Sequence, residues 1–200
     1  MRNSKKTRRK LLRAAAEHIH HYGFKDFNPH RLSIMVNMKH DVVNRSYQGM
    51  DNLIEAYIVS EDYWKALFEQ YTLPVNATEP ELRQLFIDIM QANFDRLFEH
   101  RGMQHVIWRQ ASEKNAMMRR IAEQREKDLA PFLALADKYF VGKSTSFRAV
   151  TLCVIATTYY IMNHASNTKS PMAGLDINIP AHKTEVRNAI EDIIKAVWII

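Results

Sequence analysis

Apolar side chains recur at intervals of three and four residues along most of this chain, and that spacing restricts it to an all-α fold. Only five glycines and six prolines fall within its 200 residues, so long helices are possible. The sequence has no stretch of about 18 uninterrupted apolar residues, and charged residues break up the apolar part of its basic N-terminus. We therefore expect a cytoplasmic protein with no membrane span and no secretory signal.

Capping residues mark the ends of several predicted helices. Thr7 and Gly23 suit the start and the stop of a first helix, and Asn28 followed by Pro29 suits the start of a second. Gly49 is expected to close a third. With the apolar spacing, these signals predict helices at about 7–22, 29–36, 40–46, 51–71, 81–100, 102–140 with a break near Ser112–Asn115, 147–166 and 184–200.

Three short helices near the N-terminus, with a tight turn between the last two, predict a helix-turn-helix unit. The turn falls in the segment LSIMVNMKHDVVNRSYQG, residues 32–49, and is centred on Asn37. Such a turn needs a positive φ, which asparagine tolerates better than most other residues. We expect residues 1–50 to form a DNA-binding domain, joined by a long helix over about 51–71 to a second domain of residues 72–200.

Positive charge is concentrated at the N-terminal end. Residues 1–50 hold eleven lysines and arginines against three acids, a net charge of +8, whereas the other 150 residues have a net charge of −2. A basic head on a slightly acidic body is typical of a protein that places one end on a polyanion. The alternative is a solvated basic tail without a partner.

The order of these features resembles the TetR family of bacterial transcriptional regulators. The segment TRRKLLRAAAEHIHHYGF matches the pattern of the family's first helix through Thr7, Arg8, Leu12, Ala14, Ala15 and Gly23. The segment LSIMVNMKHDVVNRSYQGMDNL, residues 32–53, matches the helix-turn-helix and the start of the linking helix in spacing, without a gap. The resemblance implies an N-terminal DNA-binding head joined to a helical effector-binding bundle.

The recognition helix departs from the family pattern. Asn37 replaces the turn glycine, and Asn44 and Ser46 replace a tyrosine and a histidine that family members commonly use on phosphates. Met50 replaces the lysine that usually opens the linking helix, and only the aromatic at Tyr47, chiefly a packing residue, is kept. These changes leave two interpretations, a retuned recognition helix and one that no longer binds DNA, and we favour the first.

Other residues can supply contacts to DNA. Asn44 can pair with adenine and Arg45 with guanine through two hydrogen bonds each, while Asp41 could accept from cytosine or cap the helix. The seven lysines and arginines before residue 14 are predicted to form a free arm that reaches the backbone or the minor groove. The predicted DNA-binding residues are Lys5, Lys6, Arg8, Arg9, Asn28, Lys39, His40, Asn44, Arg45 and Tyr47.

By the resemblance, the C-terminal domain binds a small effector and forms a homodimer through its last two helices. The segments VTLCVIATTYYIMNHA and IEDIIKAVWII carry more apolar surface than one small bundle needs, which favours pairing. Cys153, in the first segment, is expected to be a small buried side chain. Aromatic, methionine and amide side chains suit a small apolar or amphipathic effector, although each could be ordinary core. The predicted effector-binding residues are Phe86, Met90, Asn93, Trp108, Gln110, Met117, Tyr159 and Asn163.

The sequence indicates neither a catalytic motif nor a metal site. It contains no glycine-rich phosphate loop, H-E-x-x-H motif or G-x-S-x-G motif. His18, His20 and His21 have no cysteine or carboxylate at ligand spacing and are expected to be solvated or capping. We therefore expect no enzyme activity, no cofactor and no metal.

The function predicted from these patterns is a ligand-responsive transcriptional regulator. It would act as a repressor and bind a palindromic operator in double-stranded DNA as a homodimer. One alternative is a DNA-binding regulator that responds to a protein partner or to no ligand. The other is a helical interaction protein with a degenerate head that does not recognise DNA specifically.

Overall fold

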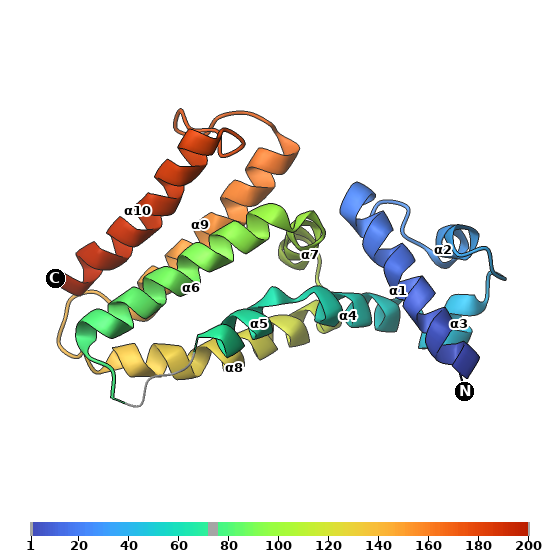
Figure 1. Cartoon of the computed structure of the whole chain (residues 1–200), viewed down its shortest axis with the longest axis horizontal. Coiled ribbons are helices and arrows are strands. Elements are labelled where there is room, and N and C mark those ends of the chain that lie inside the picture. Colours follow the sequence, from blue (N-terminus) through green and yellow to red (C-terminus); the bar gives the residue numbers. More distant parts are fainter. Residues whose placement is uncertain (1, 72–75, 200) are drawn as a thin grey trace. The chain divides into compact units, whose positions relative to one another are not determined.

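The chain is all-helical over the residues that its computed structural model describes, 2–71 and 76–199, which confirms the predicted fold class. Within these ranges an isolated bridge between Met172 and Leu175 is the one β-type pairing. No helix in them is long and apolar enough to cross a membrane. The described residues form ten helices: α1 (Arg2–Tyr22), α2 (Pro29–Met35), α3 (Val42–Tyr47), α4 (Met50–Glu61), α5 (Tyr63–Gln70), α6 (Glu79–Glu99), α7 (Arg101–Ser112), α8 (Ala116–Asp137), α9 (Phe147–Asn167) and α10 (Pro180–Ile199) (Figure 1).

The chain divides into two compact units. Unit 1 comprises Met1–Asp62 and His100–Arg120, and unit 2 comprises Tyr63–Glu99 and Ile121–Ile200. Helix α7 therefore groups with the N-terminal helices, although it lies beyond residue 72, where the sequence predicts a second domain. The two compact units do not test which segment binds DNA and which regulates, so the predicted functional domains stay a prediction. In the structure, α7 belongs to the same unit as α1–α3.

Unit 1 is built around one apolar core shared by α1, α2, α3 and α4. Each helix contributes the face that its three- and four-residue spacing predicts. The buried side chains of this core are Leu11, Ala14, Ala15, Leu32, Val42, Val43, Tyr47 and Leu53. Helix α7 also packs against α1 and α4. The core fixes the exposed residues of α3 relative to those of α1.

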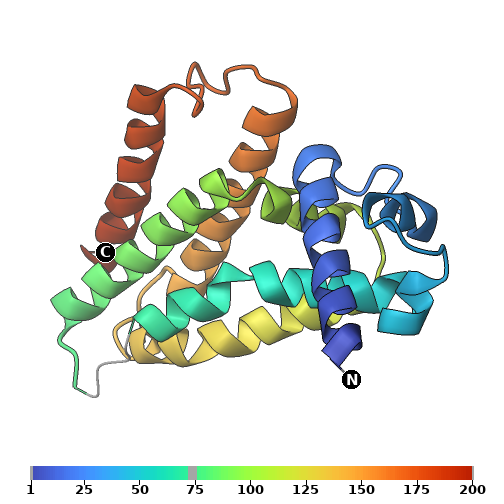
Figure 2. The same cartoon turned by 45° about the vertical axis from the view of Figure 1, so that its right-hand side comes forward.

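Unit 2 holds α6 beside α9 and α10, with α5 packed against α6 (Figure 2). The ring of Phe147 in α9 lies 4.5 Å from the ring of Phe86 in α6 and 5.4 Å from that of Trp198 in α10, measured between centroids. Arg187 of α10 donates to the Asp95 carboxylate of α6 at 2.9 Å. These aromatic and ionic contacts tie the last two helices to the bundle.

The first and the last helix both begin earlier than predicted. Helix α1 begins at Arg2 rather than Thr7, because residues 2–6 contain no glycine or proline and their lysines are good helix formers. The predicted free arm is therefore wrong, since these residues form the first turns of α1. Helix α10 begins at Pro180 rather than Thr184, and proline is well suited to the first helical position.

The single linking helix predicted over 51–71 is two helices, α4 and α5. Asp62 separates them in an extended conformation, with a φ of −70° and a ψ of 104°. Aspartate is a poor residue for a helix interior because its side chain competes for backbone hydrogen bonds. Gly49 also has another role than predicted. Gln48, with a φ of 64°, is the C-cap of α3, and Gly49, with a φ of 138°, is the N-cap of α4.

Candidate nucleic-acid interface

The turn between α2 and α3 is built around Asn37, which has a φ of 52°. The Asn37 N–H donates to the Ile34 carbonyl at 3.0 Å, and the Met38 N–H donates to the Ser33 carbonyl at 2.9 Å. This pair of bonds is the Schellman arrangement, which ends a helix at a left-handed residue. Asn37 thus adopts the positive φ that such a turn needs, and the helix-turn-helix geometry is kept without glycine.

Helix α2 begins at the cap that the sequence predicts. The Asn28 side-chain oxygen accepts from the Arg31 N–H at 2.9 Å, and its amide nitrogen donates to the Asp26 carbonyl at 3.1 Å. Both polar groups of Asn28 are therefore occupied within the chain, although the residue is exposed. The structure shows Asn28 as the N-cap of α2, and its contact with DNA stays a prediction.

Helix α3 separates core residues from exposed polar residues. Val42 and Val43 are buried against α1 and α2, whereas Asn44 and Arg45 are exposed. The two residues before the helix, Lys39 and His40, are exposed as well. This arrangement presents four hydrogen-bonding side chains to solvent from one short element and its preceding turn, as a recognition helix requires. The exposed residues of this surface are Lys39, His40, Asn44 and Arg45.

Tyr47 is part of the core rather than of the exposed surface. Its side chain is buried, and its hydroxyl donates to the Arg8 carbonyl of α1 at 3.0 Å. The Arg8 guanidinium lies over the Tyr47 ring, 4.4 Å from its centroid. These contacts fix α3 to α1, so Tyr47 positions the recognition helix and we leave it out of the proposed DNA surface.

The basic residues predicted near the N-terminus lie along α1. Lys5, Lys6, Arg8 and Arg9 are all exposed, and the Arg8 stack on Tyr47 places one of them beside α3. A helical arrangement fixes the direction of these side chains more closely than a free arm would. The structure therefore joins a basic stretch of α1 to the exposed surface of α3 within one unit.

Arg45 has one polar partner that the sequence did not assign. Its Nε lies 3.1 Å from Oδ2 of Asp41, one helical turn earlier. Asp41 stands at the N-cap position of α3 but makes no capping bond with its side chain. The alternative that Asp41 caps the helix is thereby corrected, because its carboxylate is turned towards Arg45.

The histidines of α1 do not assemble a metal site. His18 is buried rather than solvated, and its Nε2 lies 2.8 Å from the Lys25 carbonyl. Its ring also lies 5.3 Å from those of Tyr22 and Phe27, measured between centroids. Over the described ranges, no group of three or more histidine, cysteine or acidic side chains is placed to hold a metal ion.

The predicted effector residues fall in both units. Five of them lie in unit 2 and three, on α7 and the start of α8, lie in unit 1. Phe86 and Met90 are buried core residues of α6. The three in unit 1 are Trp108, Gln110 and Met117. The structure does not gather the eight within one compact unit, and their role in effector binding stays a prediction.

Asn93 and Tyr159, two of the predicted effector residues in unit 2, each accept a hydrogen bond from an aromatic side chain of α5. The Tyr63 hydroxyl donates to Oδ1 of Asn93 at 2.8 Å, and the Trp64 indole donates to the Tyr159 hydroxyl at 3.1 Å. Asn93 is fully buried, and its Nδ2 has no partner among the described residues. Asn163 instead accepts from the Asn167 side chain near the end of α9.

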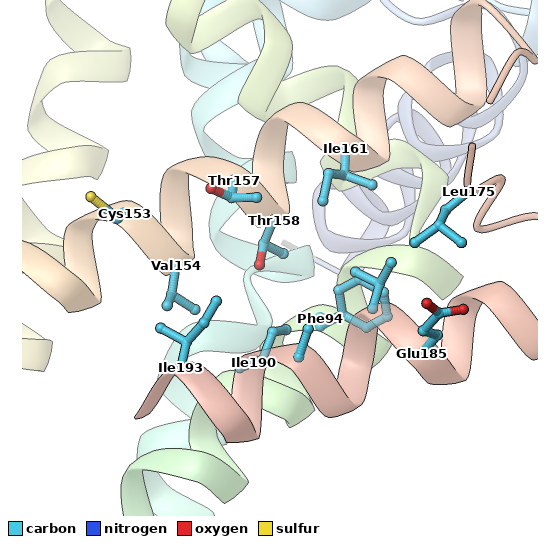
Figure 3. A pocket seen from close by; sticks show the side chains of 12 residues that line it. Phe94, Cys153, Val154, Thr157, Thr158, Ile161, Leu175, Glu185, Ile190 and Ile193 are labelled. Carbon is cyan, nitrogen blue, oxygen red and sulfur yellow. The ribbon is translucent and has the colours of Figure 1, made fainter. Parts of the chain in front are cut away.

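A pocket of about 310 Å³ opens between α6, α9 and α10. In Figure 3, Val154 and Thr158 of α9 point towards Ile190 and Ile193 of α10, with Phe94 of α6 between the two helices. None of the eight predicted effector residues is among those that line it. Sequence spacing alone could not find this pocket, because its residues look like ordinary core positions of amphipathic helices.

One side of α9 is exposed and almost without charge. Leu152 is 67% exposed and Tyr160 is 58% exposed, and Ile193 of the neighbouring α10 is 47% exposed. Cys153, predicted to be buried, is exposed on the same side and borders the pocket. The prediction was wrong because α9 is apolar on its exposed side as well as on the side that is buried in unit 2. The exposed residues of this α9 surface are Ala149, Leu152, Cys153, Ala156, Thr157 and Tyr160.

Sequence comparison gives no relative for this chain: no family model and no curated protein matches it. Its structure, however, is similar to the crystal structure of a TetR family transcription regulator from Marinobacter aquaeolei VT8, with a TM-score of 0.57. The alignment covers 99% of this chain and 97% of that chain, at 14% sequence identity. The chain has the TetR regulator fold. The TetR-like order of helices therefore extends over nearly the whole chain, well beyond the N-terminal motifs.

Proposed function

We propose that this protein is a transcriptional regulator that binds DNA through α1 and α3. The observation that carries the proposal is the turn at Asn37, which keeps the helix-turn-helix geometry although the glycine is absent. That turn holds Val42 and Val43 in the core and leaves Asn44 and Arg45 exposed.

Charge supports the same surface. Residues 1–50 have a net charge of +8, and the basic side chains of α1 join the polar surface of α3 through the stack of Arg8 on Tyr47. Lysine and arginine contacts to phosphates supply much of the affinity of a DNA-binding protein, and side chains in the major groove supply the specificity. We assign the first task to Lys5, Lys6, Arg9 and Lys39, and the second to Asn44 and Arg45.

We further propose that two copies pair through α9 and α10 and bind a palindromic operator. The exposed, nearly uncharged surface of α9, together with Ile193 of α10, supports a second copy as its partner. Its small and apolar residues recur at intervals of three and four, which is the spacing of helices that pack against each other. The pocket between α9 and α10 would then receive side chains of the second copy.

The proposed regulation is repression that a small apolar or amphipathic effector relieves. Asn93 supports a ligand in unit 2, because its buried Nδ2 is a donor that an acceptor on a bound molecule, or a water, would satisfy. An effector changes DNA affinity only as far as it binds one conformation of the protein better than the other, typically by 1–3 kcal/mol.

Selection of random duplex DNA on the purified protein, at a low and a moderate salt concentration, tests the proposal. The expected result is an enriched palindrome that persists at the higher salt. Binding that shows no sequence preference and disappears with salt would mean that α1 merely attracts phosphates. The protein would then be a helical interaction protein with a degenerate head.

A further inference from the structure

We propose that Asp41 determines base specificity by positioning Arg45 for a guanine in the major groove. The inference rests on the proposed function, since it concerns the same recognition helix. It assigns one base of each half-site to one side chain and gives the neighbouring carboxylate a positioning role. The observation behind it is the ion pair between Arg45 Nε and Asp41 Oδ2, at 3.1 Å on the exposed side of α3.

The ion pair leaves the outer edge of the guanidinium available. Arginine has five N–H groups in a planar fork, one on Nε and four on the two terminal nitrogens. Oδ2 of Asp41 lies beside the Nε group, and the Arg45 side chain has no partner other than Asp41 among the described residues. Arg45 is 61% exposed, so this edge faces solvent rather than the core. The pair therefore holds the side chain while presenting two parallel donors.

Two parallel donors match guanine better than any other base. In the major groove guanine presents two acceptors, O6 and N7, side by side, whereas adenine presents one acceptor next to an amino donor. Turning that edge away would break the ion pair, so the pair favours the orientation that suits guanine. We therefore expect the base contacted by Arg45 to be guanine.

The other role considered for Asp41 within the chain, that of capping α3, is absent. Its side chain makes no capping bond, and its second oxygen, Oδ1, is shielded from solvent without a hydrogen-bond partner among the described residues. A carboxylate beside DNA also repels the phosphates. An exposed ion pair one helical turn apart contributes little to stability. Asp41 thus weakens general attraction to DNA, and orienting Arg45 is the benefit that its position supports.

The test compares the wild type with Asp41→Asn, Asp41→Ser and Arg45→Lys on the operator that selection yields and on non-specific duplex. The wild type should lose about 5- to 150-fold in affinity when one guanine per half-site is replaced by adenine, the range for a two-bond contact. It should lose part of this when the same guanine is replaced by 7-deazaguanine, which lacks the N7 acceptor. Both losses should fall at least about twofold in each variant.

The charge of Asp41 gives a second readout that a purely structural role would not produce. Asp41→Asn and Asp41→Ser should bind non-specific duplex as tightly as the wild type or more tightly, because a negative charge near the phosphates is removed. Glu69→Gln is the matched control, since Glu69 pairs with Lys65 at the same spacing in α5 of unit 2. That control should leave the preference for guanine unchanged.

The outcomes separate this inference from the proposed function. A wild-type protein that enriches no sequence contradicts the proposed function and the inference together. Two results would contradict the inference alone. In the first, the enriched palindrome keeps its full guanine preference in both Asp41 variants. In the second, the palindrome contains no guanine whose recognition depends on Arg45. Thermal unfolding followed by circular dichroism shows that each variant is folded before its DNA binding is compared.

Discussion

The hydroxyl of Tyr57 lies against Gly102 so closely that a Cβ added to this glycine would stand 2.2 Å from its oxygen. Tyr57 belongs to α4 and Gly102 to α7, and both are buried in unit 1. The ring carbon that bears the hydroxyl would lie 3.6 Å from the added atom, an ordinary contact. A single oxygen atom therefore explains why α7 needs glycine at this point.

Replacing Gly102 with alanine should destabilise the protein by about 2 kcal/mol, because a buried tyrosine cannot move aside freely. Combining it with Tyr57→Phe, which removes the oxygen, should recover at least half of that loss. Urea unfolding of the two single variants and the double variant gives the coupling free energy between the two residues. Equal losses from Gly102→Ala with and without the hydroxyl would show that the oxygen is not the obstacle.

The turn at Asn37 should respond to substitution according to its left-handed φ. Asn37→Ala should cost about 1 kcal/mol, because alanine tolerates this region less well than asparagine. Asn37→Gly should change stability by about 0.5 kcal/mol or less, since glycine adopts this φ freely but loses more backbone entropy. Asn188→Ala, on the exposed side of the helix α10, is the control and should be neutral or slightly stabilising. If Asn37→Ala changes the free energy of unfolding as little as Asn188→Ala does, the turn does not depend on the residue at position 37.

Stability should fall at mildly acidic pH because of His105 in α7. Burial lowers the pKa of His105 below its ordinary value of 6.5, and Arg101 and His20 lower it further. The unfolded chain therefore binds a proton more readily than the folded protein. The contribution of His105 to the free energy of unfolding is complete above pH 6.5 and is lost as the pH falls towards the lowered pKa of His105.

Denaturant unfolding of the wild type and of His105→Gln at several pH values between 7.5 and 5 measures this contribution. The variant should show a weaker decline in the free energy of unfolding than the wild type over this range. His30→Gln, an exposed histidine of α2 in the same unit, serves as the matched control and should decline as the wild type does. Parallel curves for the wild type and His105→Gln would assign the acid sensitivity to other groups.

Pairing of two copies should be abolished by a charge on the α9 surface. Leu152→Asp places a carboxylate where a partner helix would exclude water, and burying an unpaired charge is costly. Sedimentation velocity should show a dimer for the wild type and a monomer for the variant. Val141→Asp introduces the same charge at a residue that is 84% exposed outside α9 and α10, and it should stay dimeric. A wild-type monomer, or a Leu152→Asp dimer, would contradict the proposed interface.

Local signals in the sequence predicted most helices and the position of the turn. The cap at Asn28, the proline after it and the positive φ at Asn37 depend on neighbouring residues alone, and all three are present in the structure. The break at Asp62 was missed because apolar residues continue at helical spacing on both sides of it. Apolar periodicity shows which face of a helix is apolar, but it does not show that a single residue such as Asp62 has a non-helical conformation.

The candidate site was predicted less completely because its properties depend on contacts between distant residues. Tyr47 was counted as a DNA contact, and only the structure shows that its hydroxyl is occupied by the Arg8 carbonyl, 39 residues away. The pairing of Asp41 with Arg45 is local, yet two other roles for Asp41 fitted the sequence equally well. The exposure of Cys153 could not be predicted, because an apolar helix has the same sequence pattern in a core and in an interface between copies.

Cys153 also makes the pairing of two copies directly measurable. It is the only cysteine of the chain, and its side chain is exposed on the α9 surface, so a thiol-reactive spin label would attach at one known point per copy. Paired helices would bring two such labels within range of a dipolar distance measurement, with or without operator DNA. The natural sequence thus provides a spectroscopic reporter at the proposed interface without any engineered cysteine.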